Sequence, residues 1–152
     1  MDIRPDRDLT DHRIVGLLQE HLRDMARHSP PESIHALDLD GLRRPELSFW
    51  TVWDGNDLLG CSALKQLDAG HGEIKSMRTA NAHRRRGVAA AMLRHLLDEA
   101  AARSYRRLSL ETGSMAAFEP ARRLYASFGF DVCGPFDSYV DDPNSVFMTR
   151  LL

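Results

Sequence analysis

The chain has 152 residues, of which 43% are hydrophobic and 28% charged, and its formal net charge is −2. This length predicts one globular domain, residues 1–152, with enough apolar side chains to bury a core. The near-neutral charge excludes a polycation built for nucleic acid, and no apolar stretch approaches the ~18 residues of a membrane span. The polar first residues and two cysteines without a CxxC pair predict a reduced, cytoplasmic protein.

The first half of the chain predicts helices followed by antiparallel strands. Apolar residues recur at helical spacing over residues 14–25, with Thr10 or Asp8 as the expected N-cap. Residues 29–42 predict a second short helix, opened by two prolines, and then a loop. Two apolar runs on either side of "DGND", residues 54–57, predict a β-hairpin, and "GEIKSMRT" predicts a further strand.

The second half alternates helices and strands. The expected elements are a helix over about 87–103, a strand over 106–112, a helix opened by Pro120 and ended by Gly129, and strands over 130–133 and 144–152. A strand, a helix and another strand in this order require a crossover between parallel strands. We therefore expect an α/β fold whose mixed sheet is mostly antiparallel, contains one parallel strand pair and is flanked by helices.

Three arginines and a glycine stand directly before the helix that begins near residue 87. A helix N-terminus presents free N–H groups to anions, and Gly87 has no Cβ to keep a phosphate away from the main chain. This arrangement predicts a phosphate-binding turn, although a solvated basic turn is the alternative. The chain has no GxxxxGK[S/T] motif and no GxGxxG after a strand, which disfavours nucleotide hydrolysis and nicotinamide chemistry. The candidate phosphate-binding residues are Arg84, Arg85, Arg86, Gly87, Val88, Ala89 and Ala90.

Two motifs carry a family resemblance. Arg84-x-x-Gly87-x-Ala89 is similar to the R/Q-x-x-G-x-G/A acetyl-CoA motif of the GNAT N-acetyltransferase superfamily, and "ARRLYASFGF", residues 121–130, resembles its A-x-x-L-Y-x-x-x-G-F segment. The order of elements resembles that family throughout, and segments from "SPPESIHALD" to "DPNSVFM" resemble its bacterial YsnE-type group. The resemblance implies an acetyl-CoA-dependent N-acetyltransferase that acetylates a primary amine of a small molecule or peptide by direct attack. No histidine pair has metal-ligand spacing, so no metal is expected.

The resemblance also implies roles for three side chains. Tyr125 aligns with a tyrosine that protonates the coenzyme thiolate in many members, although its helical stripe also suits a core tyrosine. Glu111 and Glu73 match strand glutamates that different branches use as the general base. The alternative to a catalytic role is a surface salt bridge for each glutamate, and for Glu73 the expected partner is Lys75. We rank Glu111 ahead because ligands gather beyond the carboxyl ends of strands in open α/β sheets.

Further coenzyme contacts follow from the same resemblance. Main-chain groups of Met77 and Thr79, with Arg78 between them, are implied to bind the pantetheine arm, and the Met77 amide to polarise the thioester carbonyl. Phe118 stands where many members carry an asparagine that contacts the coenzyme. That contact is expected to be lost or to be made by Ser114 instead.

A second function class is a coenzyme-binding module that has lost turnover and serves as a sensor or interaction partner. The presence of Tyr125 together with two strand glutamates favours the enzyme. The first helices and "FDSYVDDPNS", residues 136–145, are expected to shape the acceptor site. No nucleic-acid or membrane partner is expected, and a homodimer is left open.

Overall fold

Seven strands form one mixed sheet in the computed structural model, which describes residues 1–152. The strands are β1 (Asp2–Asp6), β2 (Leu47–Asp54), β3 (Asp57–Asp68), β4 (His71–Thr79), β5 (Arg107–Gly113), β6 (Asp131–Cys133) and β7 (Ser145–Leu151). Their order in the sheet is β1-β2-β3-β4-β5-β7-β6. Only β4 and β5 run parallel, so the expected mixed sheet with one parallel pair is confirmed.

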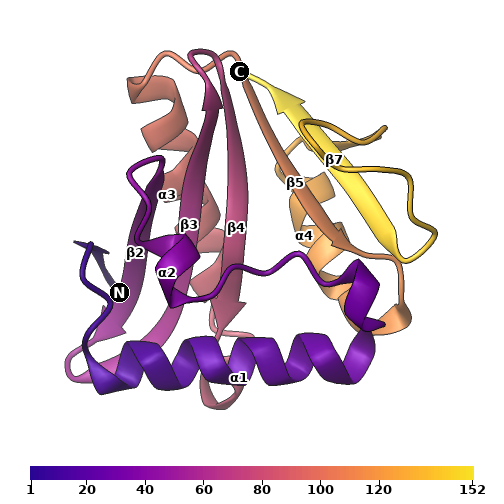
Figure 1. Ribbon diagram of the computed structural model, residues 1–152. Coiled ribbons are helices and arrows are strands. Elements are labelled where there is room, and N and C mark those ends of the chain that lie inside the picture. Colours follow the sequence, from indigo (N-terminus) through magenta and orange to yellow (C-terminus); the bar gives the residue numbers. More distant parts are fainter.

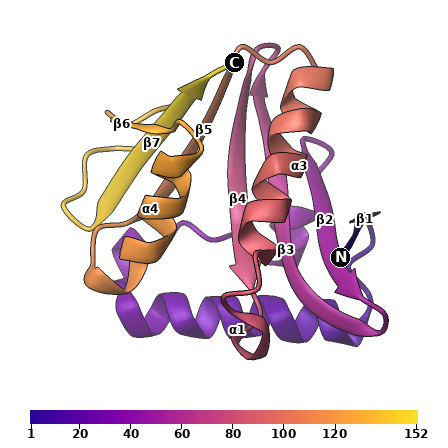
Figure 2. The same cartoon turned by 180° about the vertical axis from the view of Figure 1, so that it is seen from behind.

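Helices cover both faces of this sheet. They are α1 (His12–His28), α2 (Leu39–Leu42), α3 (Val88–Ala102) and α4 (Glu119–Ser127), with single 3₁₀ turns at Pro31–Ser33, Asn81–His83 and Ala116–Phe118. Helix α1 crosses one face (Figure 1), and α3 and α4 lie on the opposite face (Figure 2). Each face therefore has its own apolar core, the larger one beneath α3 and α4. None of these helices has the length and apolar character needed to cross a bilayer.

Several local predictions are confirmed. The β2–β3 hairpin turns at Gly55 and Asn56, between the paired residues Asp54 and Asp57, with Gly55 at φ +59°. Gly129 follows α4 at φ +87°, in the left-handed region that glycine enters without strain. The crossover helix α3 begins one residue after Gly87.

The N-terminal region departs from the predictions. The N-cap of α1 is Asp11, whose carboxylate accepts a hydrogen bond from the amide of Arg13, and not Thr10 or Asp8. The preceding residues form strand β1, which no sequence pattern indicated. An edge strand needs little apolar alternation, because it is held through main-chain pairing on one side only, and Ile3 alone packs against the core.

The expected short helix opened by Pro30 and Pro31 is also corrected. The chain forms only the 3₁₀ turn Pro31–Ser33 and, after an extended stretch, the single helical turn α2. Pro30 and Pro31 have no main-chain N–H, and Ile34 is extended at φ −92° and ψ 116°, so the turn does not propagate. This segment crosses the face of the sheet that also carries α1, in front of β4, and is not part of the sheet (Figure 1).

The parallel pair β4–β5 separates halfway along its length. Residues His71–Ile74 of β4 pair with Arg107–Leu110 of β5, and beyond these residues the two strands diverge (Figure 1). On the other side of β4, Ser76 and Met77 together lie opposite Ser62, which makes a β-bulge with Ser76 at φ +53°. The fold thus contains an opening in the middle of its sheet, bordered by an irregular strand.

Candidate active site

A pocket lies where β4 and β5 separate. Its walls come from both strands, from α1 and α4, from the segment at residues 29–36 and from Tyr139 in the loop after β6. Glu73, Glu111 and Tyr125, which the sequence placed on three separate elements, all line it. The structure therefore brings the three predicted catalytic side chains to one cavity.

Glu73 is held by two side chains. It is 2% exposed, and its Oε2 atom accepts hydrogen bonds from the Tyr139 hydroxyl at 2.6 Å and from the Lys75 ammonium at 3.2 Å. Lys75 also donates to the Tyr139 hydroxyl at 3.0 Å. The predicted pairing of Glu73 with Lys75 is present, and it balances the charge of this buried carboxylate.

Glu111 has a different environment, although it lies on the adjacent strand. Burial raises its pKa to about 7, and the carboxylate of Glu73 acts in the same direction while the ammonium of Lys75 opposes it. No cation forms a salt bridge with Glu111, in contrast to Glu73. A carboxylate with a pKa near neutrality can accept a proton and release it again at physiological pH.

Tyr125 projects from α4 into the same pocket. Its ring is 6% exposed and packs edge-on against Phe130 at 6.0 Å between centroids. The hydroxyls of Tyr105 and Tyr139 donate to Gln66 and Glu73, whereas that of Tyr125 makes no hydrogen bond within the protein. Burial raises the Tyr125 pKa, with the charge of Glu111 adding to the effect, so the phenol stays protonated and can donate.

The bulge in β4 lies at the neck of the pocket. Ser76 and Met77 both line the cavity, and the buried Ser76 Oγ has no hydrogen-bond partner. The side chain of Arg78 turns instead toward α1, where it donates to Glu20 at 2.9 Å and also bonds Asp24. Only its main chain is left for a ligand in the opening.

The turn before α3 has the geometry of an anion site. Gly87 is at φ +77°, and the first helical hydrogen bond runs from the Ala91 amide to the Gly87 carbonyl at 3.0 Å. The amides of the three residues between them, Val88 to Ala90, therefore have no helical partner. Such amides, together with the positive end of the helix dipole, suit a phosphate group.

The three arginines of this turn differ in their contacts. Arg84 lies 3.9 Å from the carboxylate of Asp24, and Arg86 lies 3.3 Å from that of Asp54. Arg85, at φ +62°, forms no salt bridge. The side chains of Arg84 and Arg86 are 61% and 48% exposed, so their salt bridges are weak and each guanidinium can turn to an anion.

Phe118 lines the far wall of the pocket, whereas Ser114 is not among the lining residues. The Phe118 ring covers the main chain of Gly113 so closely that a Cβ at that glycine would overlap it. The Ser114 hydroxyl donates to the Pro143 carbonyl at 2.7 Å and ties the end of β5 to the loop after β6. Phe118 is therefore an apolar wall of the pocket, and the predicted coenzyme contact of Ser114 stays a prediction.

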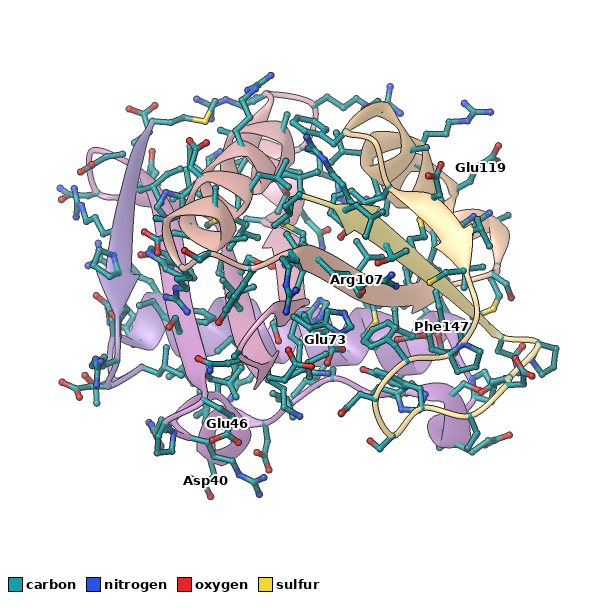
Figure 3. The ribbon with its side chains drawn as sticks, turned by 90° about the horizontal axis from the view of Figure 1, so that it is seen from above. Asp40, Glu46, Glu73, Arg107, Glu119 and Phe147 are labelled. Carbon is teal, nitrogen blue, oxygen red and sulfur yellow. The ribbon has the colours of Figure 1, made fainter.

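Sequence reasoning missed two pocket residues. Tyr139 belongs to a stretch that was expected to shape the acceptor site, and a single tyrosine within the polar run "DSYVDD" is the signal that could have found it. Its ring lies 5.4 Å from that of Phe147, and Figure 3 shows Glu73 and Phe147 on the side of the sheet away from α3 and α4. Tyr139 thereby connects this loop to the floor of the pocket.

The other missed residue is His21 on α1. It is 8% exposed, lines the pocket, and has an Nδ1 atom without a hydrogen-bond partner. Burial lowers its pKa to about 4, so the ring is neutral at physiological pH. A histidine on the apolar stripe of a helix, four residues after Leu17, was its sequence signal.

Known proteins are similar to this chain in sequence and in fold. The acetyltransferase (GNAT) family model matches residues 14–130. The chain is 60% identical to the uncharacterized N-acetyltransferase YsnE from Bacillus subtilis (strain 168) over 152 residues, which is 100% of each chain. A crystal structure from Klebsiella pneumoniae has a TM-score of 0.80 at 25% identity and covers 99% of this chain and 97% of that one.

A second solved structure is informative for its ligand. It is a GNAT family acetyltransferase from Elizabethkingia anophelis with acetyl-CoA bound, with a TM-score of 0.70, 16% identity and coverage of 99% of this chain and 97% of that one. At this identity the likeness shows the fold. Together with the match over residues 14–130 and the full-length similarity to YsnE, it leads to one conclusion. The chain belongs to the GNAT acetyltransferase family and is an N-acetyltransferase.

Proposed function

We propose that the protein transfers the acetyl group of acetyl-CoA to a primary amine by direct attack, with Glu111 as general base and Tyr125 as general acid. One observation carries this proposal: both side chains line the pocket that opens at the β4 bulge, where the parallel strands part. The acetyl-CoA bound to the relative from Elizabethkingia anophelis supports the donor.

The donor has a continuous path on this chain. Its pyrophosphate fits the free amides at the start of α3, and the exposed Arg84, Arg85 and Arg86 add charge-assisted contacts. Its pantetheine arm fits the opening between β4 and β5, where the main chain from Met77 to Thr79 has no neighbouring strand on the β5 side. An arm that pairs with a free strand edge gains main-chain hydrogen bonds.

Proton transfers follow from the two side chains. An alkyl amine with a pKa near 10 arrives protonated, and Glu111 accepts its proton. The neutral nitrogen attacks the thioester carbonyl, forming the N–C bond as the C–S bond breaks, and a main-chain amide at Met77 stabilises the oxyanion. Tyr125, whose hydroxyl makes no hydrogen bond within the protein, donates its proton to the departing thiolate. The second proton of the attacking nitrogen then passes to the Tyr125 phenolate, which leaves a neutral amide and free coenzyme A.

Glu73 is a positioning residue in this proposal. Its carboxylate holds Lys75 and Tyr139 at the pocket wall and is already matched by a cation. Both contacts engage the Oε2 atom of Glu73, and one of them comes from a cation, so we assign this carboxylate to holding the pocket wall. The two glutamates thus divide into a base and a support.

The test is release of free thiol from acetyl-CoA in the presence of a panel of amines and peptides, with mass spectrometry of the acetylated product. We expect amine-dependent thiol release without added metal. Tight acetyl-CoA binding with no release for any acceptor would favour a coenzyme-binding sensor instead.

A further inference from the structure

The chain contains only two lysines, Lys65 and Lys75, beside 18 arginines. Both lysines line one cavity, which adjoins the active-site pocket and shares His35, Glu73, Lys75 and Tyr139 with it. The side chain of lysine ends in a compact ammonium group that can bind a small anion, whereas that of arginine ends in a planar guanidinium. The placement of both lysines marks this cavity as chemically distinct.

Lys65 is a cation without a partner. It lies on β3 directly opposite Glu73 of β4, so the two side chains share one face of the sheet. It is half-buried, and it forms neither a hydrogen bond nor a salt bridge. Glu73 is engaged by Lys75 and Tyr139, and the other carboxylate that lines this cavity, Asp137, is exposed to solvent.

Lys75 is the cation whose charge acts on the proposed base. It donates to Glu73 and Tyr139, which leaves the third hydrogen of its ammonium group free. The register between β4 and β5 ends at Ile74 and Leu110, so Lys75 and Glu111 are the next residues on the two diverging strands. The charge of Lys75 reaches the Glu111 carboxyl, whose pKa it lowers against the effect of burial. One small molecule can therefore contact both groups.

A clasp between two loops limits the size of that molecule. The Ser33 hydroxyl donates to Asp142 at 2.6 Å, and the Asn144 amide reaches Ser33 at 3.4 Å. These contacts join the segment before α2 to the loop after β6 at the acceptor end of the pocket. The clasp favours a compact acceptor over a polypeptide chain.

We propose that the acceptor is a free amino acid, whose amine lies at Glu111 and whose carboxylate binds the ammonium groups of Lys75 and Lys65. This inference rests on the proposed function. The amine supplies the nucleophile and the carboxylate fixes its orientation, so an acceptor that lacks the carboxylate loses a charge-assisted contact to each lysine.

The first experiment compares matched acceptors by thiol release from acetyl-CoA. The panel contains free α-amino acids, β-alanine and 4-aminobutyrate, each beside its carboxamide and its decarboxylated amine. We expect kcat/KM to be at least about ten-fold higher for some free acids than for the two matched compounds that lack the carboxylate. Equal rates for acids and carboxamides would overturn the amino-acid acceptor and leave the proposed function intact. Absence of release with every amine, peptides included, would instead contradict the proposed function.

The second experiment tests whether Lys65 causes the preference for the free amino acid over its carboxamide. Lys65→Gln is expected to raise KM for the preferred amino acid about ten-fold and to abolish the preference over its carboxamide, with the KM for acetyl-CoA unchanged. Arg44→Gln, which removes an exposed cation without a salt bridge near the start of β2, is the matched control and should keep the preference. A folded Lys65→Gln variant, judged by its thermal unfolding, that retains the full preference would overturn the assignment.

Discussion

Tyr139 donates a 2.6 Å hydrogen bond to the carboxylate of Glu73, a residue 66 positions earlier in the chain. The bond joins the loop after β6 to strand β4 and, with Lys75, satisfies a carboxylate that is 2% exposed. Glu111 on the next strand has no such cation partner, and its pKa rises to about 7. Two carboxylates in one pocket thus have different environments: Glu73 is paired with a cation, and Glu111 is not.

Glu73→Gln tests the supporting role of that carboxylate. Glutamine keeps the size of the side chain but leaves the Lys75 ammonium without its counter-ion, so we expect a lower melting temperature and a loss of kcat/KM smaller than that of Glu111→Gln. The pH profile of kcat/KM should keep its acidic limb, displaced to lower pH because the Glu73 carboxylate that helps to raise the Glu111 pKa is gone. If this variant alone loses the acidic limb, the base is Glu73 and our ranking is wrong.

Glu111→Gln tests the base. Because the carboxylate must be ionised to accept a proton, kcat/KM of the parent should rise with pH through about 7, the pKa given by burial. Glutamine should flatten this limb and lower kcat/KM at pH 8 by about 10²-fold. An unchanged profile in both glutamate variants would mean that the enzyme works mainly by positioning an amine that loses its proton to water.

The same variant has a consequence for stability. The Glu111 pKa is about 7 in the folded protein against 4.5 for a free glutamate side chain, so folding favours the protonated carboxyl. The stability of the parent is therefore unaffected below about pH 4.5 and falls as pH rises to about 7, by up to about 3 kcal/mol. Urea unfolding should show Glu111→Gln to be more stable than the parent at pH 8, and the difference should disappear near pH 4.5. A pH-independent difference would show that Glu111 titrates normally.

Local signals made much of this fold predictable. The Gly55–Asn56 turn, the left-handed Gly129 and the glycine that opens α3 are each specified by a few neighbouring residues, and all three are present. Strand β1 had no such signal, because its pairing partner lies more than 40 residues away in β2. Two adjacent prolines predict a helix start from the sequence, whereas in the structure they open only a 3₁₀ turn.

The site divides in the same way. Glu73, Glu111 and Tyr125 stand in motif-bearing strands and a helix, so their shared pocket follows once the order of elements is known. Tyr139 contacts Glu73 across a long loop, and nothing near either residue specifies that contact. The difference between the two glutamates depends on this contact and on burial, both of which are properties of the folded chain.

Gly87→Glu tests the phosphate-binding turn. A glutamate there places bulk and negative charge where the pyrophosphate is proposed to bind, so acetyl-CoA binding measured by calorimetry should be lost. Gly87→Ala is the matched control, because it imposes the same backbone strain at φ +77° and its Cβ meets no other atom within 4 Å. Alanine should weaken binding much less than glutamate, and binding by the parent should weaken at high salt because the arginine contacts are screened. Unchanged affinity in a folded Gly87→Glu protein would contradict the proposed seat.

Tyr125→Phe isolates the proton donor. The phenylalanine ring retains the packing on Phe130, and the lost hydroxyl makes no hydrogen bond within the protein, so the melting temperature and the affinity for acetyl-CoA should stay close to those of the parent. The thiolate would then leave without its donor, and kcat should fall about ten-fold or more. Stopped-time thiol release at saturating acetyl-CoA measures this directly. A variant with full kcat would show that Tyr125 serves the core beneath α4. The thiolate would then take its proton from water, because the other tyrosine in the pocket, Tyr139, already donates its hydroxyl proton to Glu73.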